Sequence, residues 1–389
     1  MKERKKIENT VGMFDMLKGV MMILVVFAHN SSVFPGSFLN EATAESSYKA
    51  IRFMSFVYEL HILPRIVFSL VTLFIVPMMP ILLIIGGYGF RKRPVSKSIK
   101  GYYKDLIKPY IYTTIAIIIC NTCIHYAFFR YLPGALKESF RVFISLVLGV
   151  SQTITLGEET IYANGPIWFM LAMFWSLIIF NVIMNYAKEK LIPYIVFAIS
   201  LVGWLLSYLK FTPWCLSQGM VAVLYAYIGY RLKKNKFFSR NFTVKDKILV
   251  ITLVLIPNIV FTCFGLTTEM ADNIYSLGPI SYIENGLMGI FLMYLFLRMN
   301  SLSGPVSDSI RKIGRYSLYF MCVHTVEMIA VPWYKVAEIF GDKQMVGFWV
   351  LYVARVALIL FIVFLITKIN DHIKKLKENR NEKAAVNNA

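Results

Sequence analysis

Long apolar segments without charged residues recur along the whole chain, and they constrain its fold more than any other feature. Runs such as Ile81–Ile85 and Ile115–Ile119 lie inside them. Of the 389 residues, 57% are apolar and 16% are charged, whereas soluble domains carry about 45–50% apolar and about 25% charged residues. Such a chain needs lipid as the solvent for much of its surface, which excludes a soluble enzyme and a disordered protein. We therefore expect an all-α polytopic membrane protein.

Ten segments are long enough to cross about 30 Å of hydrocarbon as helices, which takes roughly 20 apolar residues. They are residues 12–33, 67–90, 109–129, 166–187, 191–210, 214–231, 248–266, 278–299, 314–333 and 346–368. A further apolar stretch, residues 140–156, is short and carries Arg141 and Gln152. We expect an interfacial or re-entrant helix there, and whether it crosses stays open.

The basic residues indicate which side each loop lies on. With ten crossings both termini share one side, and the loops on that side hold 31 of the 41 Lys and Arg residues. Because cytoplasmic loops carry the positive excess, we expect both termini in the cytoplasm. The net charge of +19 then reflects topology, so nucleic acid is not an expected partner. No Pro/Gly-rich linker divides the chain, which predicts one membrane domain, residues 1–375, and a charged cytoplasmic tail, residues 376–389.

The first predicted helix carries three ionisable residues, Asp15, Lys18 and His29. Ionisable groups inside hydrocarbon are expensive and mark functional sites. All three lie on one helix face, because 11 residues turn a helix by about 1100°, only about 20° beyond three full turns. The simpler alternative is that Lys18 snorkels to the cytoplasm while His29 bonds a neighbouring helix.

The ninth predicted span places His324 in mid-membrane with Glu327 three residues later, on nearly the same face. A carboxylate at this spacing can hold one imidazole tautomer and raise its basicity, as general bases require. Glu327 can equally pair with Arg355 of the last helix, and both possibilities stay open. Other polar residues of the outer half, for substrate contact or packing, are Asn121, Glu284 and Asn285.

A strongly basic segment follows the second predicted span and contains Arg91, Lys92, Arg93, Lys97, Lys100, Lys104 and Lys108. Part of this charge anchors the chain at the cytoplasmic surface. The segment can also hold the phosphates of a soluble anionic cofactor, because Arg contacts phosphate bidentately and Lys acts as a point charge. Arg315, at the cytoplasmic entrance to the His324 helix, can close the same site.

Two other patterns have simple explanations when taken alone. The segment Asn164–Phe169 begins the fourth span, where Pro166 supplies a fixed φ and Trp168 can serve as an interfacial anchor. Cys120 and Cys123 have metal or redox spacing, but no other soft ligand is near in sequence. We interpret all five cysteines as packing residues and expect no metal.

Four ordered motifs together resemble acyltransferase family 3, the polytopic membrane O-acyltransferases that modify cell-envelope glycans. They are the Lys18 to His29 helix, the turn Gly86–Arg91 with its basic loop, the start Gly165–Phe169, and the Gly314–Ser317 segment leading to His324. The Asp-x-Leu-Lys-Gly form around Lys18, where Arg is more common, resembles the fucose 4-O-acetylase branch.

The resemblance implies a membrane enzyme of the bacterial cytoplasmic membrane that uses cytoplasmic acyl-CoA, with acetyl-CoA favoured, as donor. The donor phosphates would bind Arg91, Arg93, Lys97 and Arg315. A membrane-associated or envelope glycan hydroxyl would be the acceptor, with His29 as general base assisted by Asp15 and Lys18. Trp168 or a protonated His324 would stabilise the oxyanion. Direct transfer and a covalent relay both stay open, as does the oligomeric state.

Two alternatives from other functional classes explain part of the pattern. A proton-coupled transporter or flippase for a lipid-linked sugar would use the buried His and Glu residues as a proton relay. It leaves the basic loop and the Gly-Pro-x-Trp start unexplained. A sensor or assembly subunit with a degenerate site is the second alternative. A requirement for an acyl donor separates the enzyme from both.

Overall fold

The computed structural model describes residues 10–30, 74–156, 159–209, 212–240, 243–263, 266, 268–299, 301–341 and 343–387. Most of them are helical. The α-helices are α1 (Thr10–Asn30), α4 (Met78–Gly89), α5 (Val95–Tyr102), α6 (Lys108–Phe129), α7 (Leu132–Leu148), α8 (Trp168–Tyr186), α9 (Ile192–Leu206), α10 (Leu216–Lys234), α11 (Val244–Val250), α12 (Ile256–Cys263), α13 (Pro279–Met299), α14 (Pro305–Arg315), α15 (Ser317–Ala330), α16 (Trp333–Ala337) and α17 (Gln344–Asn387).

Shorter elements connect or interrupt these helices. Two are π-helical, η2 (Tyr103–Ile107) and η7 (Ile251–Leu255). The 3-10 turns are η3 (Gly165–Ile167), η4 (Glu189–Leu191), η5 (Pro213–Cys215), η6 (Phe237–Ser239) and η8 (Glu338–Phe340). Two antiparallel hairpins pair β1 (Ile154–Leu156) with β2 (Glu159–Ile161), and β3 (Thr268–Glu269) with β4 (Ile274–Tyr275).

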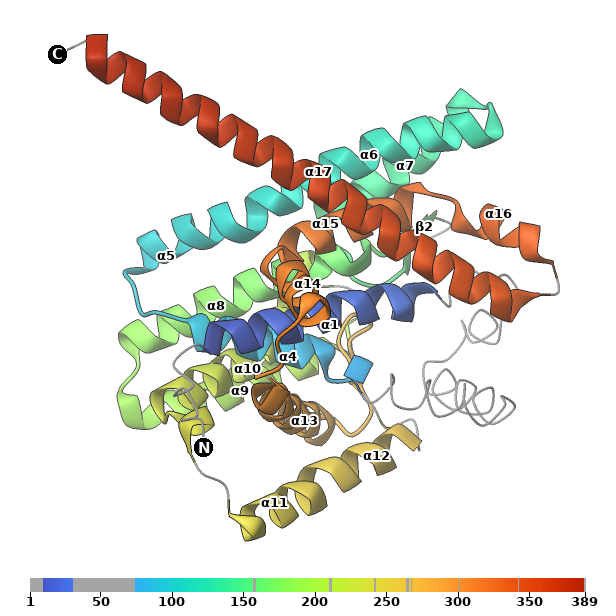
Figure 1. Ribbon diagram of the computed structural model, residues 1–389. Helices are drawn as coiled ribbons and strands as arrows, with labels where there is room; N and C mark the ends of the chain where they lie inside the picture. Colours follow the sequence, from blue (N-terminus) through green and yellow to red (C-terminus); the bar gives the residue numbers. More distant parts are fainter. Residues whose placement is uncertain are drawn as a thin grey trace.

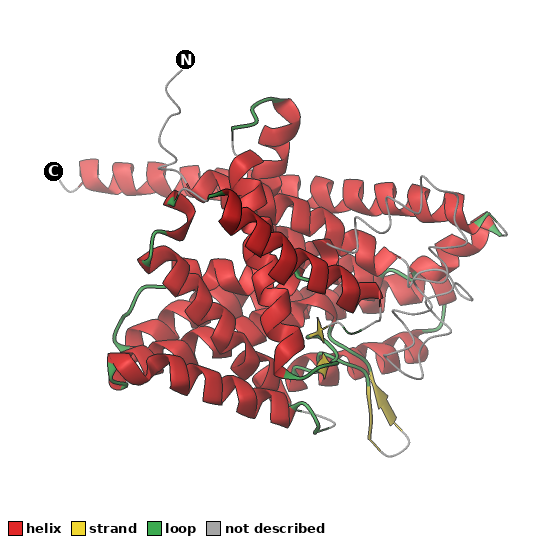
Figure 2. Cartoon of the chain, turned by 90° about the horizontal axis from the view of Figure 1, so that it is seen from below, coloured by secondary structure: helices red, strands yellow, loops and turns green. Residues whose placement is uncertain are grey.

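Helix α1 lies at the centre of the bundle (Figure 1). It packs against α4, α13, α14, α15 and α17. On one side α4 packs against α10, which also contacts α8 and α9. On the other side α15 packs against α6 and α17. The long helix α17 ends near the C-terminus and runs along one edge of the molecule in Figure 2, and α5–α6 is the other long helical segment in Figure 1. The central position of α1 puts its ionisable face between the two halves of the bundle.

Proline and left-handed residues set the ends of several helices. Pro lies in the first turn of α6, α7, α9 and α14, where its missing N–H costs no helical hydrogen bond. Helix α7 ends at Gly149, whose φ is +66°, a backbone conformation that glycine adopts without a steric penalty. Thr243 begins α11 with a reciprocal capping box to Asp246, which satisfies two otherwise unpaired N–H groups.

The crossing of α1 and α14 depends on two glycines. A Cβ atom at Gly314 would lie 1.7 Å from the Asp15 carbonyl oxygen, and one at Gly19 would lie 2.0 Å from the Ile310 carbonyl oxygen. Only a residue without a side chain allows the two backbones to approach this closely. The small residues therefore fix how Asp15 of α1 faces the end of α14.

Five helical segments of the described part of the chain are long and apolar enough to cross a membrane. They are Val95–Phe129, Gly165–Tyr186, Glu189–Leu206, Pro279–Leu297 and Val346–Leu376. Two shorter apolar helices are Met78–Gly89 and Ser317–Ala330. A multi-pass, all-α membrane protein is therefore confirmed, whereas the expected ten crossings and the cytoplasmic termini stay predictions.

Helices occupy most of the expected spans, with differences at their ends. The ninth, residues 314–333, is interrupted at Tyr316, whose backbone is not helical (φ −98°, ψ 18°) and which separates the end of α14 from the start of α15. The first part of the expected span 67–90 falls outside the described residues. The last helix, α17, continues through residue 375 to Asn387, so the expected boundary between domain and tail lies within one helix.

Of the apolar stretch 140–156, for which a helix was expected, only residues 140–148 are helical, as the second half of α7, whereas residues 154–156 form strand β1. Helix α7 runs back along α6. Tyr110 near the start of α6 donates a hydrogen bond of 2.5 Å to the carbonyl of Leu146 near the end of α7. Asn121 donates to Ser139 at 2.9 Å. These contacts assign Asn121 a packing role between the two helices.

Candidate functional site

Helices α1 and α15 bring the two predicted histidines together. The ring centroids of His29 and His324 are 5.5 Å apart, with an angle of 43° between the ring planes. His324 is fully buried, whereas His29 is partly exposed. The pair therefore joins a fully buried histidine to one that is only partly buried.

Glu327 contacts His324 and Arg355 at the same time, so both pairings that the sequence left open are present. Its Oε1 atom lies 2.8 Å from His324 Nδ1. The Arg355 guanidinium donates to Oε1 at 2.9 Å and to Oε2 at 3.2 Å. The Trp333 indole adds a hydrogen bond of 2.5 Å to Oε2. These contacts satisfy a carboxylate that is only 4% exposed, which its burial requires.

Arg355 also connects this group to the end of α1. Its side chain is 0% exposed, and it donates to Asn30 Oδ1 at 3.2 Å and to the His29 carbonyl at 3.4 Å. Asn30 in turn donates to the Phe348 carbonyl at 2.8 Å. The charged group of α15 and α17 thus fixes the backbone position of the helix turn that carries His29.

The sequence did not predict the roles of Asn30 and Trp333. Asn30 directly follows His29, and a polar residue next to a histidine of a predicted membrane span was the available signal. Trp333 lies beyond the Val331–Pro332 break after α15. The Trp333 indole reaches Glu327 only because the chain turns back at this break. The residue pattern along the sequence does not specify such a turn.

The contacts of Glu327 define the tautomer of His324. A bidentate guanidinium favours the ionised carboxylate, which can only accept hydrogen bonds. His324 Nδ1 then carries the proton, and in the neutral imidazole Nε2 keeps its lone pair. Nε2 is buried and has no hydrogen-bond partner among the described residues. An oriented imidazole with an available lone pair has the arrangement of a general base.

Asp15, Lys18 and Arg315 form a second ionic group at the other end of α1. Lys18 Nζ lies 3.1 Å from Asp15 Oδ1, and Arg315 Nε lies 3.4 Å from Asp15 Oδ2. Lys18 and His29 are about 16 Å apart along the helix at 1.5 Å per residue. A ligand that reached both groups would therefore have to be at least about 16 Å long.

The predicted basic residues Arg91, Arg93 and Lys97 are all exposed. The loop that carries them is fixed at Arg93, whose backbone N–H donates to Asn181 Oδ1 at 3.2 Å. The Arg93 carbonyl accepts from the Asn181 and Asn185 side chains at 3.0 Å each. Because the backbone is held by α8, the three cationic side chains project from a defined position.

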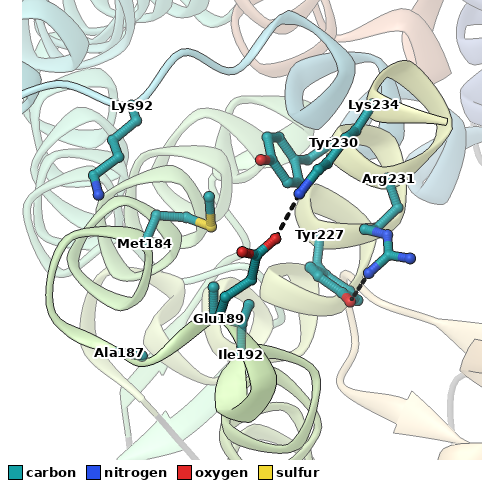
Figure 3. A pocket seen from close by; sticks show the side chains of 9 residues that line it. All are labelled: Lys92, Met184, Ala187, Glu189, Ile192, Tyr227, Tyr230, Arg231 and Lys234. Atoms are coloured by element: carbon teal, nitrogen blue, oxygen red, sulfur yellow. Dashed lines mark hydrogen bonds and ion pairs between the residues drawn. The ribbon is translucent and has the colours of Figure 1, made fainter. Parts of the chain in front are cut away.

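A basic pocket of about 330 Å³ lies beside this loop (Figure 3). Its lining residues are Lys92, Met184, Ala187, Glu189, Ile192, Tyr227, Tyr230, Arg231 and Lys234. Lys234 Nζ lies 2.6 Å from Glu189 Oε1, and this hydrogen bond raises the pKa of Lys234 above its ordinary value. Arg231 donates to the Tyr227 hydroxyl at 3.0 Å. Three cations, of which Lys234 is paired with the Glu189 carboxylate, give the lining a net positive charge that suits an anion.

The pocket and the ionic group of α1 are linked through Tyr88. Lys233, next to Lys234, places its ammonium 6.0 Å from the Tyr88 ring centroid. The Tyr88 ring packs against Phe14 at 4.9 Å between centroids, and Phe14 precedes Asp15. The end of α10 and the start of α1 therefore lie at the same end of the bundle.

Trp168 is not part of the histidine group. It is 3% exposed and packs edge to face against Phe169, and no hydrogen bond joins its indole to either histidine among the described residues. The preceding turn η3 packs on α15, where a Cβ at Gly165 would lie 2.7 Å from Met328 Cε. The Gly-Pro-x-Trp segment thus supports the helix of His324, and an oxyanion role of Trp168 stays a prediction.

The described residues contain no group of three or more His, Cys, Asp or Glu side chains that could hold a metal ion. Cys120 and Cys123 are free thiols on the outer surface of α6, one half-buried and one exposed. Their spacing is therefore not accompanied by converging ligands in this part of the chain.

Comparison with known proteins identifies the family. No curated protein and no solved structure gave a significant match. A family model described as an acyltransferase domain matches residues 12–368, which includes both histidines, the basic loop and the pocket. The match gives no support to the transporter alternative. Since it covers nearly the whole chain, the protein belongs to the acyltransferase domain family, acyltransferase family 3, and is a multi-pass membrane acyltransferase.

Proposed function

We propose that the protein is an O-acyltransferase that moves an acyl group, acetyl in the simplest case, from cytoplasmic acyl-CoA to a hydroxyl of a cell-envelope glycan or lipid-linked sugar. The observation that carries this proposal is a chain of contacts among buried side chains: Arg355 pairs with Glu327, and Glu327 contacts His324. The ring of the partly exposed His29 lies next to His324. A hydroxyl is a weak nucleophile at neutral pH and needs a base as it attacks.

The acceptor oxygen attacks the thioester carbonyl carbon while its proton passes to an imidazole. The tetrahedral intermediate then collapses, the carbon–sulfur bond breaks, and the proton returns to the departing thiolate. The products are an ester and free coenzyme A thiol. The transfer involves no change of oxidation state. The proton that the imidazole takes from the acceptor hydroxyl is the proton that it gives to the thiolate, so one base is sufficient.

We assign the accepting position to His29, because it is the partly exposed member of the pair. The lone pair of His324 Nε2 is available to a proton on the His29 ring after a small movement. Catalytic hydrogen bonds are commonly long before substrate binds. Glu327 orients His324 and balances the positive charge that develops on the pair, and Arg355 holds Glu327 in position.

The donor would bind from the end where α1 begins. Its phosphates would lie on Arg91, Arg93 and Lys97 and in the adjacent basic pocket, where cations are exposed to solvent. Its thin pantetheine arm would extend past Tyr88 and Lys18 toward His29. Arg315, which forms an ion pair with Asp15, would add a further positive charge at this end. With the cytoplasmic assignment of this end, the acceptor arrives from the opposite face.

Transfer from labelled acetyl-CoA in inside-out bacterial membrane vesicles tests the proposal. The acetyl group carries the label, and base-labile label is counted in the lipid and glycan fractions. Wild type is compared with His29→Ala at matched expression. We expect label in one fraction that depends on His29 and on the donor.

Two outcomes would contradict the proposal. Equal labelling by the two proteins would remove His29 from the reaction. Absence of label from acetyl-CoA and from longer acyl-CoA donors, with both proteins well expressed and acceptor present, would remove the coenzyme A thioester as donor.

A further inference from the structure

Trp333 contacts both members of the buried Glu327–Arg355 pair although it belongs to a different helix from either. It begins α16, directly after the break at Val331 and Pro332. Val331 is extended, with φ −94° and ψ 121°, and the Trp333 backbone N–H donates to the Val331 carbonyl at 2.8 Å. Pro332 has no N–H with which to continue the helix. The chain therefore turns back here and directs the Trp333 side chain toward α15.

The indole N–H of Trp333 reaches two oxygens of one residue. Nε1 lies 2.5 Å from Glu327 Oε2 and 3.2 Å from the Glu327 carbonyl oxygen. The same carbonyl accepts the Val331 N–H at 3.1 Å, which continues the hydrogen-bond pattern of α15. A single side chain outside α15 thus holds both the backbone and the carboxylate of Glu327.

The two carboxylate oxygens of Glu327 accept from four donors among the described residues. Oε1 lies 2.8 Å from His324 Nδ1 and accepts from Arg355 Nη2 at 2.9 Å. Oε2 accepts from Arg355 Nε at 3.2 Å and from the Trp333 indole. An ionised carboxylate has about four acceptor sites. The carboxylate therefore cannot rotate without losing a hydrogen bond, and Oε1 stays directed at His324.

The indole ring covers the cation of the pair. The guanidinium carbon of Arg355 lies 5.5 Å from the Trp333 ring centroid, within the range of a cation–π contact. Arg355 is 0% exposed, whereas Trp333 is partly exposed, so the ring shields the guanidinium on one side. A tryptophan that only anchors a protein at the membrane surface sits at the level of the lipid headgroups with its polar N–H in a wet region. The Trp333 N–H is turned inward, to Glu327.

Helix α16 also packs on the turn of α1 that precedes His29. Ala337 lies in one cluster with Phe27 of α1 and Phe348 of α17, and Trp333 packs against this cluster. Phe27 is two residues before His29. Helix α16 contacts α17 near the end opposite to the C-terminus (Figure 1). The indole is thus held against the two helices that carry His29 and Arg355.

We propose that Trp333 is a positioning residue for the transfer reaction. Its N–H holds the carboxylate that orients His324, and its ring holds Arg355, which contacts the His29 carbonyl. The proposal rests on the proposed acyl transfer and assigns a role to a residue outside the four sequence motifs. Positive charge develops on the histidine pair during transfer, and a fixed carboxylate stabilises that charge without reorganising. Deletion of a contact that matters only at this stage lowers kcat and kcat/KM equally.

Three variants separate the N–H group of Trp333 from the bulk of its ring. Trp333→Phe keeps an aromatic ring beside Arg355 and deletes the donor. Trp333→His restores the donor, because an imidazole superposes on the pyrrole ring of indole with Nε2 in place of Nε1, and it removes the benzene ring. Trp333→Leu deletes both. Trp349→Phe is the matched control, since Trp349 packs on Phe27 at 5.9 Å and on Tyr352 at 6.2 Å in the same region.

Activity is measured as transfer from labelled acetyl-CoA in inside-out membrane vesicles at matched expression, and thermal stability is measured on the purified proteins. We expect Trp333→Phe to lower kcat by about 10-fold, the effect of one hydrogen bond to a charged group, with the donor KM unchanged. Trp333→His should be less stable than Trp333→Phe, because it leaves the larger cavity, and yet more active. Trp333→Leu should be the least active, and Trp349→Phe should keep the wild-type kcat.

A second measurement does not depend on turnover. The chain has five histidines, so isotope labelling of histidine nitrogen gives a small set of side-chain NMR signals from the full-length protein in nanodiscs. Substitution of the other four histidines, one at a time, assigns the Nδ1–H signal of His324 by elimination. We expect this signal to shift and broaden in Trp333→Phe and to stay unchanged in Trp349→Phe.

The outcomes distinguish this proposal from the proposed function. A His324 signal that changes in Trp333→Phe, with no transfer by the wild type, would support the positioning of His324 by Trp333 and refute transfer from acetyl-CoA. An unchanged His324 signal in Trp333→Phe would overturn the positioning role, whether or not the wild type is active. Wild-type kcat in Trp333→Phe, or an order of activities that follows thermal stability, would also overturn it and leave Trp333 as a packing residue.

Discussion

Replacing Glu327 by Gln removes the charge of a carboxylate that is 4% exposed and leaves Arg355, which is 0% exposed, without its ionic partner. Loss of one member of a buried ion pair costs about 3–5 kcal/mol of unfolding free energy. The bidentate contact at 2.9 and 3.2 Å places this pair at the upper part of that range. We expect Glu327→Gln to be among the most destabilising isosteric changes in the bundle.

The double variant Glu327→Gln/Arg355→Met separates the two roles of Glu327. It removes the unpaired guanidinium and replaces it with an apolar side chain of similar length. The Asn30 Oδ1 and His29 carbonyl contacts are then lost, at about 1–3 kcal/mol for unpaired buried groups. The double variant should therefore recover about 2 kcal/mol relative to the single variant. Activity should not recover, because His324 still lacks a charged partner, and the loss in kcat should be about 10²- to 10⁴-fold in both proteins.

Stability is measured by SDS titration of the purified protein, and activity by transfer from labelled acetyl-CoA. Glu338→Gln is the control, since Glu338 forms an exposed ion pair with Lys335 and should behave as wild type in both assays. Recovered activity in the double variant would show that the only role of Glu327 is to pair with Arg355. It would refute the proposal that Glu327 orients His324 for catalysis. Unchanged stability in Glu327→Gln would refute the buried ion pair.

His29→Ala should lower kcat by at least about 100-fold with little change in thermal stability, and a fully active and stable His29→Ala protein would exclude it as the base; His324→Ala should lower kcat similarly but should also destabilise the protein, because it leaves a cavity and removes a partner of the buried Glu327 carboxylate. Gly314→Ala should destabilise the protein by about 1–3 kcal/mol and weaken donor binding, because its methyl group would collide with the Asp15 carbonyl, and a wild-type melting temperature would contradict the close crossing. Lys18→Arg should retain more activity than Lys18→Ala, since the charge beside Asp15 persists, and equal losses would favour geometry over charge. Lys234→Ala should raise the donor KM. Glu189→Gln should lower the donor KM, because it releases Lys234 from its ion pair. Unchanged donor KM values in both variants would show that the basic pocket is not part of the donor site.

Sequence reasoning located the helices and both histidines because composition and helical periodicity are local properties. Asp15, Lys18 and His29 share one face of one helix, so 3.6-residue periodicity was sufficient. Glu327 follows His324 by three residues, and that spacing made their contact one of the two pairings that the sequence left open. Arg355 was foreseen only as an alternative partner, because its distance to Glu327 depends on how α15 and α17 pack.

The remaining parts of the site depend on tertiary contacts that no local pattern specifies. The basic pocket combines Lys92 with residues of α8, η4, α9 and α10, and it arises only when those elements pack. Gly87, Gly165 and Gly314 looked like family motif residues without a stated role. In the structure each allows a close approach, to α10, α15 and α1 respectively. The motifs therefore describe the packing around the site as much as its chemistry.

The π-helical turn η2 changes the phase of the long helix from Val95 to Phe129. A π turn contains one residue more than an α turn, which rotates everything after it by about 100° relative to an uninterrupted helix. Upstream, Lys97 and Lys100 face solvent; downstream, Tyr110, Thr113 and Asn121 face the bundle. Relatives that lack one residue between positions 103 and 107 would therefore present a different side of α6 to the bundle, although an alignment would show only a single gap.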